Sequence, residues 1–256
     1  MQKKKLKAVV LAAGKGTRLH SEQYDLPKVM RMAAGKPLLG YVLGALDFIA
    51  PEDTIIVVGY KKDQVMSAFG GYAFAEQREQ LGTGHAVMAA YGLLDGYNGD
   101  VLVCCGDMPL LTRESYLGLC REHEKNGAAC TILSGTSSVP LPYGRIIRGE
   151  NGGFERMVEE RDCTPEQKAI DELNSGVYIF DAATLGGVLS ELRSDNSQGE
   201  YYLTDAPALI REKGGRVCVY KRDLGLEIIG VNTPEQLAET ERIIETRRAG
   251  REKEQS

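Results

Sequence analysis

The stretch KAVVLAAGKGTRLH, residues 7–20, decides which class of fold the chain adopts. It begins with an apolar run that contains paired valines, which predicts a buried β-strand. Directly after this run, Gly14 and Gly16 flank Lys15, and Arg18 follows two positions later. Glycines let a backbone approach an oxyanion closely, and successive N–H groups in such a turn can bind an anion. The stretch has the form of a strand followed by a phosphate-binding loop; a plain tight turn with solvated cations is the alternative.

A second cation behind this loop favours phosphate binding. Lys28 follows a stiff Leu-Pro pair, and the planar guanidinium of Arg18 suits phosphate oxygens. Two common phosphate loops do not match. A Walker loop requires serine or threonine after its Gly-Lys pair, where this chain has Gly16. A dinucleotide-binding fingerprint requires a third glycine where this chain has Leu19, so a dehydrogenase is a distant alternative.

Outward from this loop, apolar runs rich in β-branched residues alternate with helical patterns. Such alternation predicts βαβ units, and therefore an α/β fold with a Rossmann-like, mostly parallel sheet and helices on both faces. The second half has more strands per residue, which predicts an antiparallel excursion. We expect strands at 7–14, 54–60, 72–77, 100–107, 128–135, 144–148, 172–181, 216–223 and 226–232, and helices at 37–49, 61–69, 83–94, 112–125, 182–192 and 203–213.

The chain is expected to form one domain, residues 1–232, followed by a C-terminal helix and charged tail, residues 233–256. Thr233-Pro234 and a glutamine at the third helical position predict the start of this helix. Leu237, Ile243 and Ile244 would give it one apolar face to dock. The charged end, residues 245–256, lacks apolar periodicity, so we expect a solvated, frayed tail.

Composition excludes several classes of protein. The 256 residues carry a net charge of −5, which argues against a nucleic-acid partner bound through a basic face. No apolar run is long enough to span a bilayer. The six cysteines include no CxxC pair, which argues against a zinc site and is typical of a reducing cytoplasm. The sequence specifies no oligomeric state.

Several motifs resemble those of one enzyme family. LAAGKGTRL followed by LPKV is similar to the N-terminal motif of sugar-phosphate nucleotidyltransferases. Later motifs resemble the UDP-N-acetylglucosamine pyrophosphorylase family and occur in its order: EQREQLGTGHAV (76–87), GDMPLL (106–111), PYGRIIR (142–148), MVEERD (157–162), ELNSGVY (172–178), QGEYYLTD (198–205) and GVN (230–232). The resemblance spans residues 6 to about 245. It implies a nucleotide-diphospho-sugar transferase fold and Mg²⁺-dependent transfer from UTP to N-acetylglucosamine 1-phosphate, with release of pyrophosphate.

The resemblance also implies roles for the residues around the phosphates. Arg18 and Lys28 would hold the triphosphate and stabilise the departing pyrophosphate, beside a substrate-binding loop formed by Leu11, Ala12, Ala13 and Gly14. Asp107 and Asn232 would bind Mg²⁺, which prefers hard oxygen ligands; Arg18, Lys28 and Asp107 form the expected catalytic set. The simpler interpretation of Asp107 is a turn acid before proline, and that of Asn232 is a turn residue beside the helix cap.

Two further groups would bind the base and the sugar. By resemblance, Gln77, Gly82 and Thr83 read uracil, since an amide and exposed backbone groups can match its edge. Gly144, Glu159 and Asn174 would bind the sugar, with the carboxylate accepting from its hydroxyls. A glycine turn between a strand and a helix, and a charged surface stretch around Glu159, are the respective structural alternatives.

The chain departs from the family pattern in three places. The segment between Arg18 and Lys28 is longer than usual, and Cys105 stands where the family often has tyrosine. The sequence also lacks the hexapeptide period of the family's acetyltransferase domain, so we expect no acetyltransferase activity. Transfer to another sugar 1-phosphate such as glucose 1-phosphate, with UTP or dTTP, and a non-catalytic nucleotide-sugar sensor stay open as alternatives.

Overall fold

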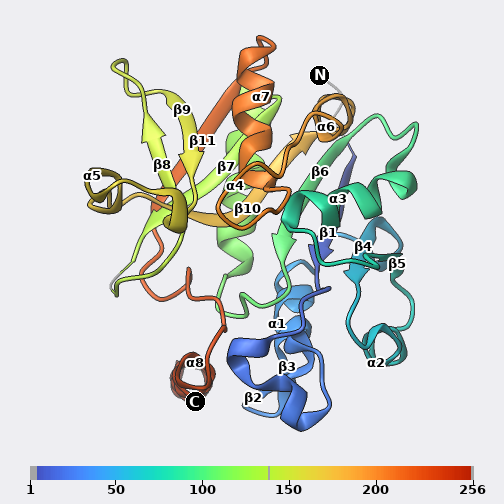
Figure 1. Cartoon of the computed structure of the whole chain (residues 1–256). Helices are drawn as coiled ribbons and strands as arrows, with labels where there is room; N and C mark the ends of the chain where they lie inside the picture. Colours follow the sequence, from blue (N-terminus) through green and yellow to red (C-terminus); the bar gives the residue numbers. More distant parts are fainter. Residues whose placement is uncertain (1–4, 138, 255–256) are drawn as a thin grey trace.

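A computed structural model describes residues 5–137 and 139–254. Within these residues, nine strands form one mixed sheet in the order β11-β7-β10-β6-β1-β4-β5, and β8 and β9 extend it from β10 (Figure 1). Their bounds are β1 Leu6–Leu11, β4 Thr54–Val58, β5 Ala73–Glu76, β6 Asp100–Cys105, β7 Cys130–Thr136, β8 Arg145–Arg148, β9 Phe154–Val158, β10 Leu173–Asp181 and β11 Val217–Asp223. The short strands β2 (Met32–Ala33) and β3 (Lys36–Pro37) form a separate ribbon.

The central strands are parallel, as the sequence predicts. β1 lies between β4 and β6 and is parallel to both, and β5 and β11 also join their neighbours in parallel. β10 is antiparallel to both β6 and β7, and β8 and β9 form an antiparallel hairpin beside its start. The expected α/β fold and the antiparallel excursion are therefore confirmed. The hairpin lies at one side of the sheet, on the left in Figure 1.

Helices cover both faces of the sheet because the central strands are apolar on both sides. In β1, Ala8 and Val10 belong to one core, and Val9 belongs to the other. Residues of α1, α2, α4 and α8 pack in the first core, and residues of α3, α6 and α7 in the second. The helices are α1 Leu38–Ala45, α2 Lys62–Ala68, α3 Thr83–Tyr91, α4 Arg113–Asn126, α5 Pro165–Lys168, α6 Ala182–Leu189, α7 Ala206–Glu212 and α8 Pro234–Glu254.

The expected strand at 226–232 is wrong. After β11 ends, the chain forms a turn instead of another strand. Its apolar residues Ile228, Ile229 and Val231 are nevertheless buried in the first core. The segment is held by Val231 N, which donates to the carbonyl of Asp107 at 2.9 Å. Burial alone produced the apolar pattern, and the turn carries Asn232 to the loop that follows β6.

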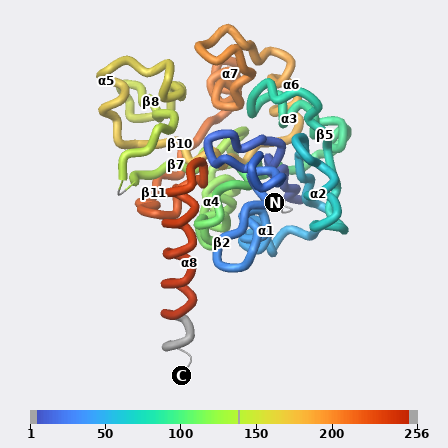
Figure 2. The backbone as a smooth tube through the Cα atoms, turned by 60° about the horizontal axis from the view of Figure 1, so that its bottom comes forward, coloured from blue at the N-terminus to red at the C-terminus, as the bar shows by residue number. Residues whose placement is uncertain are grey.

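The C-terminal helix starts as predicted and continues further than predicted. Thr233 and Gln236 exchange the reciprocal hydrogen bonds of a capping box. Ile243 and Ile244 are buried against the first core. The helix then runs through most of the expected frayed tail, to Glu254, and Figure 2 shows it extending from the body of the molecule. Arg247 stabilises this part by donating to the Leu110 carbonyl at 2.9 Å.

Among residues 5–137 and 139–254, no helix combines the length and apolar composition needed to cross a bilayer.

Candidate active site at the carboxyl ends of β1 and β6

Two adjoining cavities open where β1 and β6 end, the edge at which parallel α/β sheets place ligands. Their volumes are about 190 Å³ and about 240 Å³. Leu11, Thr83, Cys105 and Asp107 line both cavities and so form their shared wall. We call the smaller cavity, which also contains Glu159 and Asn174, the first cavity, and the other, which also contains Gln77 and Lys28, the second cavity.

The structure brings the predicted site residues together. The first cavity is lined by Leu11, Thr83, Asp107, Gly144, Glu159, Asn174 and Asn232. The second is lined by Leu11, Ala12, Ala13, Gly14, Lys28, Gln77, Gly82, Thr83 and Asp107. Arg18 lines neither cavity and reaches the site through Asn232. These residues come from seven motifs that the sequence spaces over more than 200 positions.

Four of them form a charged cluster where the cavities meet. Lys28 Nζ forms an ion pair with Asp107 and donates to Asn232 Oδ1 at 2.8 Å. Arg18 Nη2 donates to the same oxygen at 3.0 Å. The side chains of Lys28 and Asp107 are only 13% and 20% exposed, so their attraction is weakly screened. Two cations are thus concentrated at one point beside a carboxylate, an arrangement suited to binding phosphates.

The longer segment between Arg18 and Lys28 is folded as compact turns. His20 and Asp25 within it have left-handed backbone conformations, with φ of 51° and 54°. Gln64 in α2 donates to the Asp25 carbonyl at 2.9 Å and so attaches the segment to the domain. Within the described residues the segment comprises three 3-10 turns: η1 Thr17–Leu19, η2 Ser21–Tyr24 and η3 Lys28–Met30. The additional residues therefore do not prevent Lys28 from reaching Asp107.

Gly16 makes room for Lys28 and not for a ligand. Its φ is +73°, and an added Cβ would lie 2.7 Å from the Cβ of Lys28. A Cβ added at Gly14 would meet no atom within 4 Å. Of the two glycines in the loop, Gly14 leaves space in the second cavity, and Gly16 allows the backbone to pack closely against the Lys28 side chain.

Asp107 and Asn232 can hold a divalent metal ion. The Val231 N–H bond to the Asp107 carbonyl keeps their two segments together. Asn232 Nδ2 donates to the Gly230 carbonyl at 3.2 Å, which turns Oδ1 toward the cations. A carboxylate and an amide oxygen are hard ligands, and phosphate oxygens and water can complete an octahedron. No group of three or more His, Cys, Asp or Glu with ligand geometry occurs among the described residues.

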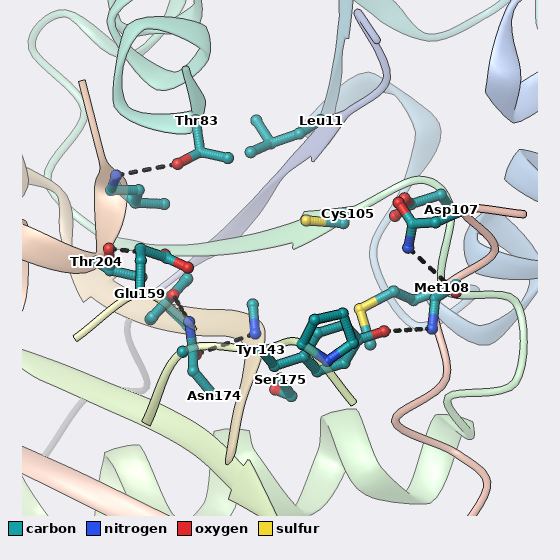
Figure 3. Close-up of a pocket in the computed structure, with 17 residues that line it drawn as sticks. Leu11, Thr83, Cys105, Asp107, Met108, Tyr143, Glu159, Asn174, Ser175 and Thr204 are labelled. Atoms are coloured by element: carbon teal, nitrogen blue, oxygen red, sulfur yellow. Dashed lines mark hydrogen bonds between the residues drawn. The ribbon is translucent and has the colours of Figure 1, made fainter. Parts of the chain in front are cut away.

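The far end of the first cavity contains the half-buried carboxyl group of Glu159. Glu159 Oε1 accepts from Thr204 Oγ1 at 3.0 Å. Burial raises the pKa of Glu159, the Thr204 bond opposes this shift, and neighbouring acidic residues reinforce it. A Cβ added at Gly144 would lie 3.5 Å from Glu159 Oε2, so a larger residue would fill this corner. In Figure 3, Asp107 and Glu159 lie at opposite ends of the cavity, with Cys105 between them.

Asn174 has less freedom than the sequence suggested. Only 8% of this residue is exposed. Its Nδ2 donates to the Tyr178 hydroxyl at 2.7 Å, and its Oδ1 accepts from Gly176 N at 3.0 Å. Its backbone N donates to the Gly144 carbonyl at 2.8 Å. The amide therefore has fixed orientation, and a ligand would meet it already held in place.

The second cavity is bounded by the turn before α3. Gln77 is 4% exposed, and its Nε2 donates to the Gly82 carbonyl at 3.0 Å. Gly82 has φ of +105°, and an added Cβ would lie 2.6 Å from the Tyr201 carbonyl. This glycine is needed for packing against Tyr201. Thr83 Oγ1 accepts from Leu203 N at 3.0 Å, which further joins the turn to the segment before α7.

Sequence reasoning missed Tyr143 and Thr204. The Tyr143 hydroxyl accepts from Gly230 N at 2.7 Å, so it attaches the first cavity's wall to the turn that carries Asn232. Burial raises its pKa far above the ordinary value, and the hydroxyl stays neutral. The only sequence signal for Tyr143 was its position beside Gly144 in the PYGRIIR motif. Thr204 lies in QGEYYLTD, a motif to which the sequence alone assigned no chemistry.

A mixed sheet with helices on both faces, and with paired cations and hard oxygen donors at the carboxyl ends of its strands, is typical of a nucleotidyltransferase. The chain belongs to the MobA-like NTP transferase domain family, whose model matches residues 8–163. It is 43% identical over 245 residues to the bifunctional protein GlmU of Geobacter metallireducens, covering 94% of this chain and 51% of that protein. It is 44% identical over 244 residues to the GlmU of Trichlorobacter lovleyi, with coverages of 94% and 52%. The chain thus spans about half the length of the curated relatives it matches.

Proposed function

We propose that this chain transfers the uridylyl group of UTP to N-acetylglucosamine 1-phosphate, giving UDP-N-acetylglucosamine and pyrophosphate with Mg²⁺ as cofactor. The observation that carries the proposal is the cluster of Arg18, Lys28, Asp107 and Asn232 at the junction of two cavities. One cavity would hold the nucleotide and the other the sugar, so that their phosphates meet at the cluster. The GlmU relatives and the order of the motifs support this assignment.

The chain's residues would act mainly by positioning two anions. The sugar phosphate attacks the α-phosphorus in line, so holding both substrates in one geometry lowers the barrier. Lys28 and Arg18 neutralise the triphosphate and stabilise charge on the departing pyrophosphate. Asp107 and Asn232 would hold Mg²⁺, which would supply further charge stabilisation for the phosphates. No side-chain nucleophile is required, because the attacking oxygen belongs to the substrate.

The cavity walls would provide selectivity. Glu159, with Thr204 beside it, would accept from sugar hydroxyls at the end of the first cavity. Gly144 would leave room for the ring, and the held Asn174 amide would limit its orientation. In the second cavity, Gln77 and the Gly82-Thr83 turn would face the uracil. All six cysteines are free thiols, which supports a cytoplasmic location for this reaction.

The test is pyrophosphate release across four nucleotides and four sugar 1-phosphates. The pair UTP and N-acetylglucosamine 1-phosphate should give the highest kcat/KM. Faster turnover with glucose 1-phosphate or dTTP would move the assignment to another nucleotidyltransferase. Tight UDP-sugar binding without turnover would identify a sensor. The absence of both binding and turnover would refute the proposal.

A variant pair tests the role of the cluster. Asp107→Asn should lower kcat/KM by at least about 100-fold, since it removes the charge of a proposed metal ligand. Asp47→Asn is the matched control, because Asp47 is an exposed carboxylate paired with Arg113 and lines neither cavity. Equal turnover by the two variants would contradict the assignment.

A further inference from the structure

The Gln77 side chain is held from two directions at the edge of the second cavity. Its Nε2 donates to the Gly82 carbonyl at 3.0 Å and lies 3.1 Å from Nδ1 of His85, in the first turn of α3. Gln77 is 4% exposed, so water does not readily replace these partners. The His85 ring in turn lies 6.3 Å from the Tyr201 ring, between centroids.

These contacts determine which hydrogen-bonding groups remain free. An amide nitrogen has two hydrogens, and the Gly82 carbonyl can only accept one of them. If His85 Nδ1 accepts the other, its proton must lie on Nε2 and the ring must be neutral. Both donors of Gln77 are then used, and Oε1 is the only side-chain group that it can offer to a ligand. Such an oxygen accepts a hydrogen bond and cannot donate one.

We propose that His85 is a positioning residue that holds the Gln77 amide with its oxygen free, so that the second cavity favours a pyrimidine with a ring N–H over one with an unprotonated ring nitrogen. Uracil and thymine have N3–H, whereas cytosine has a lone pair at N3, which an amide oxygen repels. Without the His85 acceptor, the amide keeps one anchor, at Gly82, and rotates more readily to offer a donor to cytosine. The inference rests on the proposed use of a uridine nucleotide.

The binding test compares UTP with CTP by calorimetry, which does not depend on turnover. His85→Leu removes the acceptor and keeps a side chain of similar size. It should reduce the preference for UTP about fivefold, as expected for one neutral hydrogen bond of about 1 kcal/mol. His85→Asn places a carbonyl oxygen near the former Nδ1 position and should retain most of the wild-type preference. Melting temperatures verify that both variants are folded.

The matched control is Gln80→Leu. Gln80 also lines the second cavity, but its amide donates to the Gln77 main-chain carbonyl at 3.4 Å and not to the side chain. This variant can weaken both nucleotides, while their affinity ratio should stay at the wild-type value. In wild-type protein, ¹⁵N NMR of His85 should report the neutral tautomer with its proton on Nε2.

The outcomes separate this inference from the proposed function. A folded His85→Leu protein with the wild-type UTP to CTP ratio overturns the role of His85, even if pyrophosphate release is normal. A His85→Asn protein that loses preference as far as His85→Leu also overturns it. Reduced discrimination in His85→Leu, rescued in His85→Asn, supports the role even if no sugar 1-phosphate is turned over.

Discussion

Gly16→Ala is the most informative single change to the glycine-rich loop after β1, because Gly16 lies against Lys28. At φ of +73°, an L-residue costs about 1–2 kcal/mol in backbone strain. The added Cβ would also be 2.7 Å from the Cβ of Lys28 and 2.9 Å from Ser21 Oγ. Crowding of this kind costs about 1–3 kcal/mol. The free energy of unfolding should therefore fall by about 2–5 kcal/mol.

Gly152→Ala provides a matched control. Gly152 has φ of +74°, and an added Cβ there meets no atom within 4 Å. It should lose only the strain of about 1–2 kcal/mol, measured by urea unfolding. Because Gly16→Ala can relieve its crowding by moving Lys28, kcat/KM for pyrophosphate release should drop about 10- to 100-fold, whereas Gly152→Ala should keep wild-type activity. Equal stability losses in the two variants, or normal turnover in Gly16→Ala, would refute the reasoning.

Three other changes test the charged groups. Because burial raises the pKa of Glu159, its ionised carboxylate destabilises the folded state at pH values above the ordinary glutamate pKa. Glu159→Gln should therefore raise the free energy of unfolding at pH 7, yet weaken sugar 1-phosphate binding by about 10- to 100-fold. A loss of stability would contradict this. Lys28→Met removes a cation that competes with metal for Asp107. Charges of +1 and +2 about 4 Å apart repel by roughly 2 kcal/mol in water. Nucleotide-free protein should therefore bind Mn²⁺ about 30-fold more tightly by electron paramagnetic resonance, and unchanged affinity would exclude the competition. Burial opposes ionisation of Glu172, but hydrogen bonds from Arg148 and Ser134 hold its pKa below the ordinary value of 4.5. The stability advantage of wild type over Glu172→Gln should therefore shrink as pH falls below about 4.5. A difference in the free energy of unfolding that does not change with pH would exclude this ion pair as its source.

Most of the secondary structure was predictable because it depends on short-range patterns. Apolar β-branched runs predicted β1, β4, β6 and β7, and the Thr233 cap predicted the start of α8. The prediction of a strand at 226–232 was wrong because an apolar run indicates that a segment is buried but does not indicate which elements pack against it. The expected tail became helix for a related reason: the Arg247 contact with the Leu110 carbonyl is tertiary and leaves no periodic signal.

The sequence by itself determined the α/β class, the glycine-rich loop after the first strand and the residue types on which the proposed nucleotidyltransferase site depends. Only the tertiary structure decided that Arg18 and Asn232, 214 positions apart, share a hydrogen bond. The tertiary structure also decided that Gly16 packs against Lys28 and that the Asn174 amide donates to the Tyr178 hydroxyl. The physical reason is range: propensity, capping and turn chemistry act over a few residues, whereas the meeting of distant side chains follows from strand register and core packing.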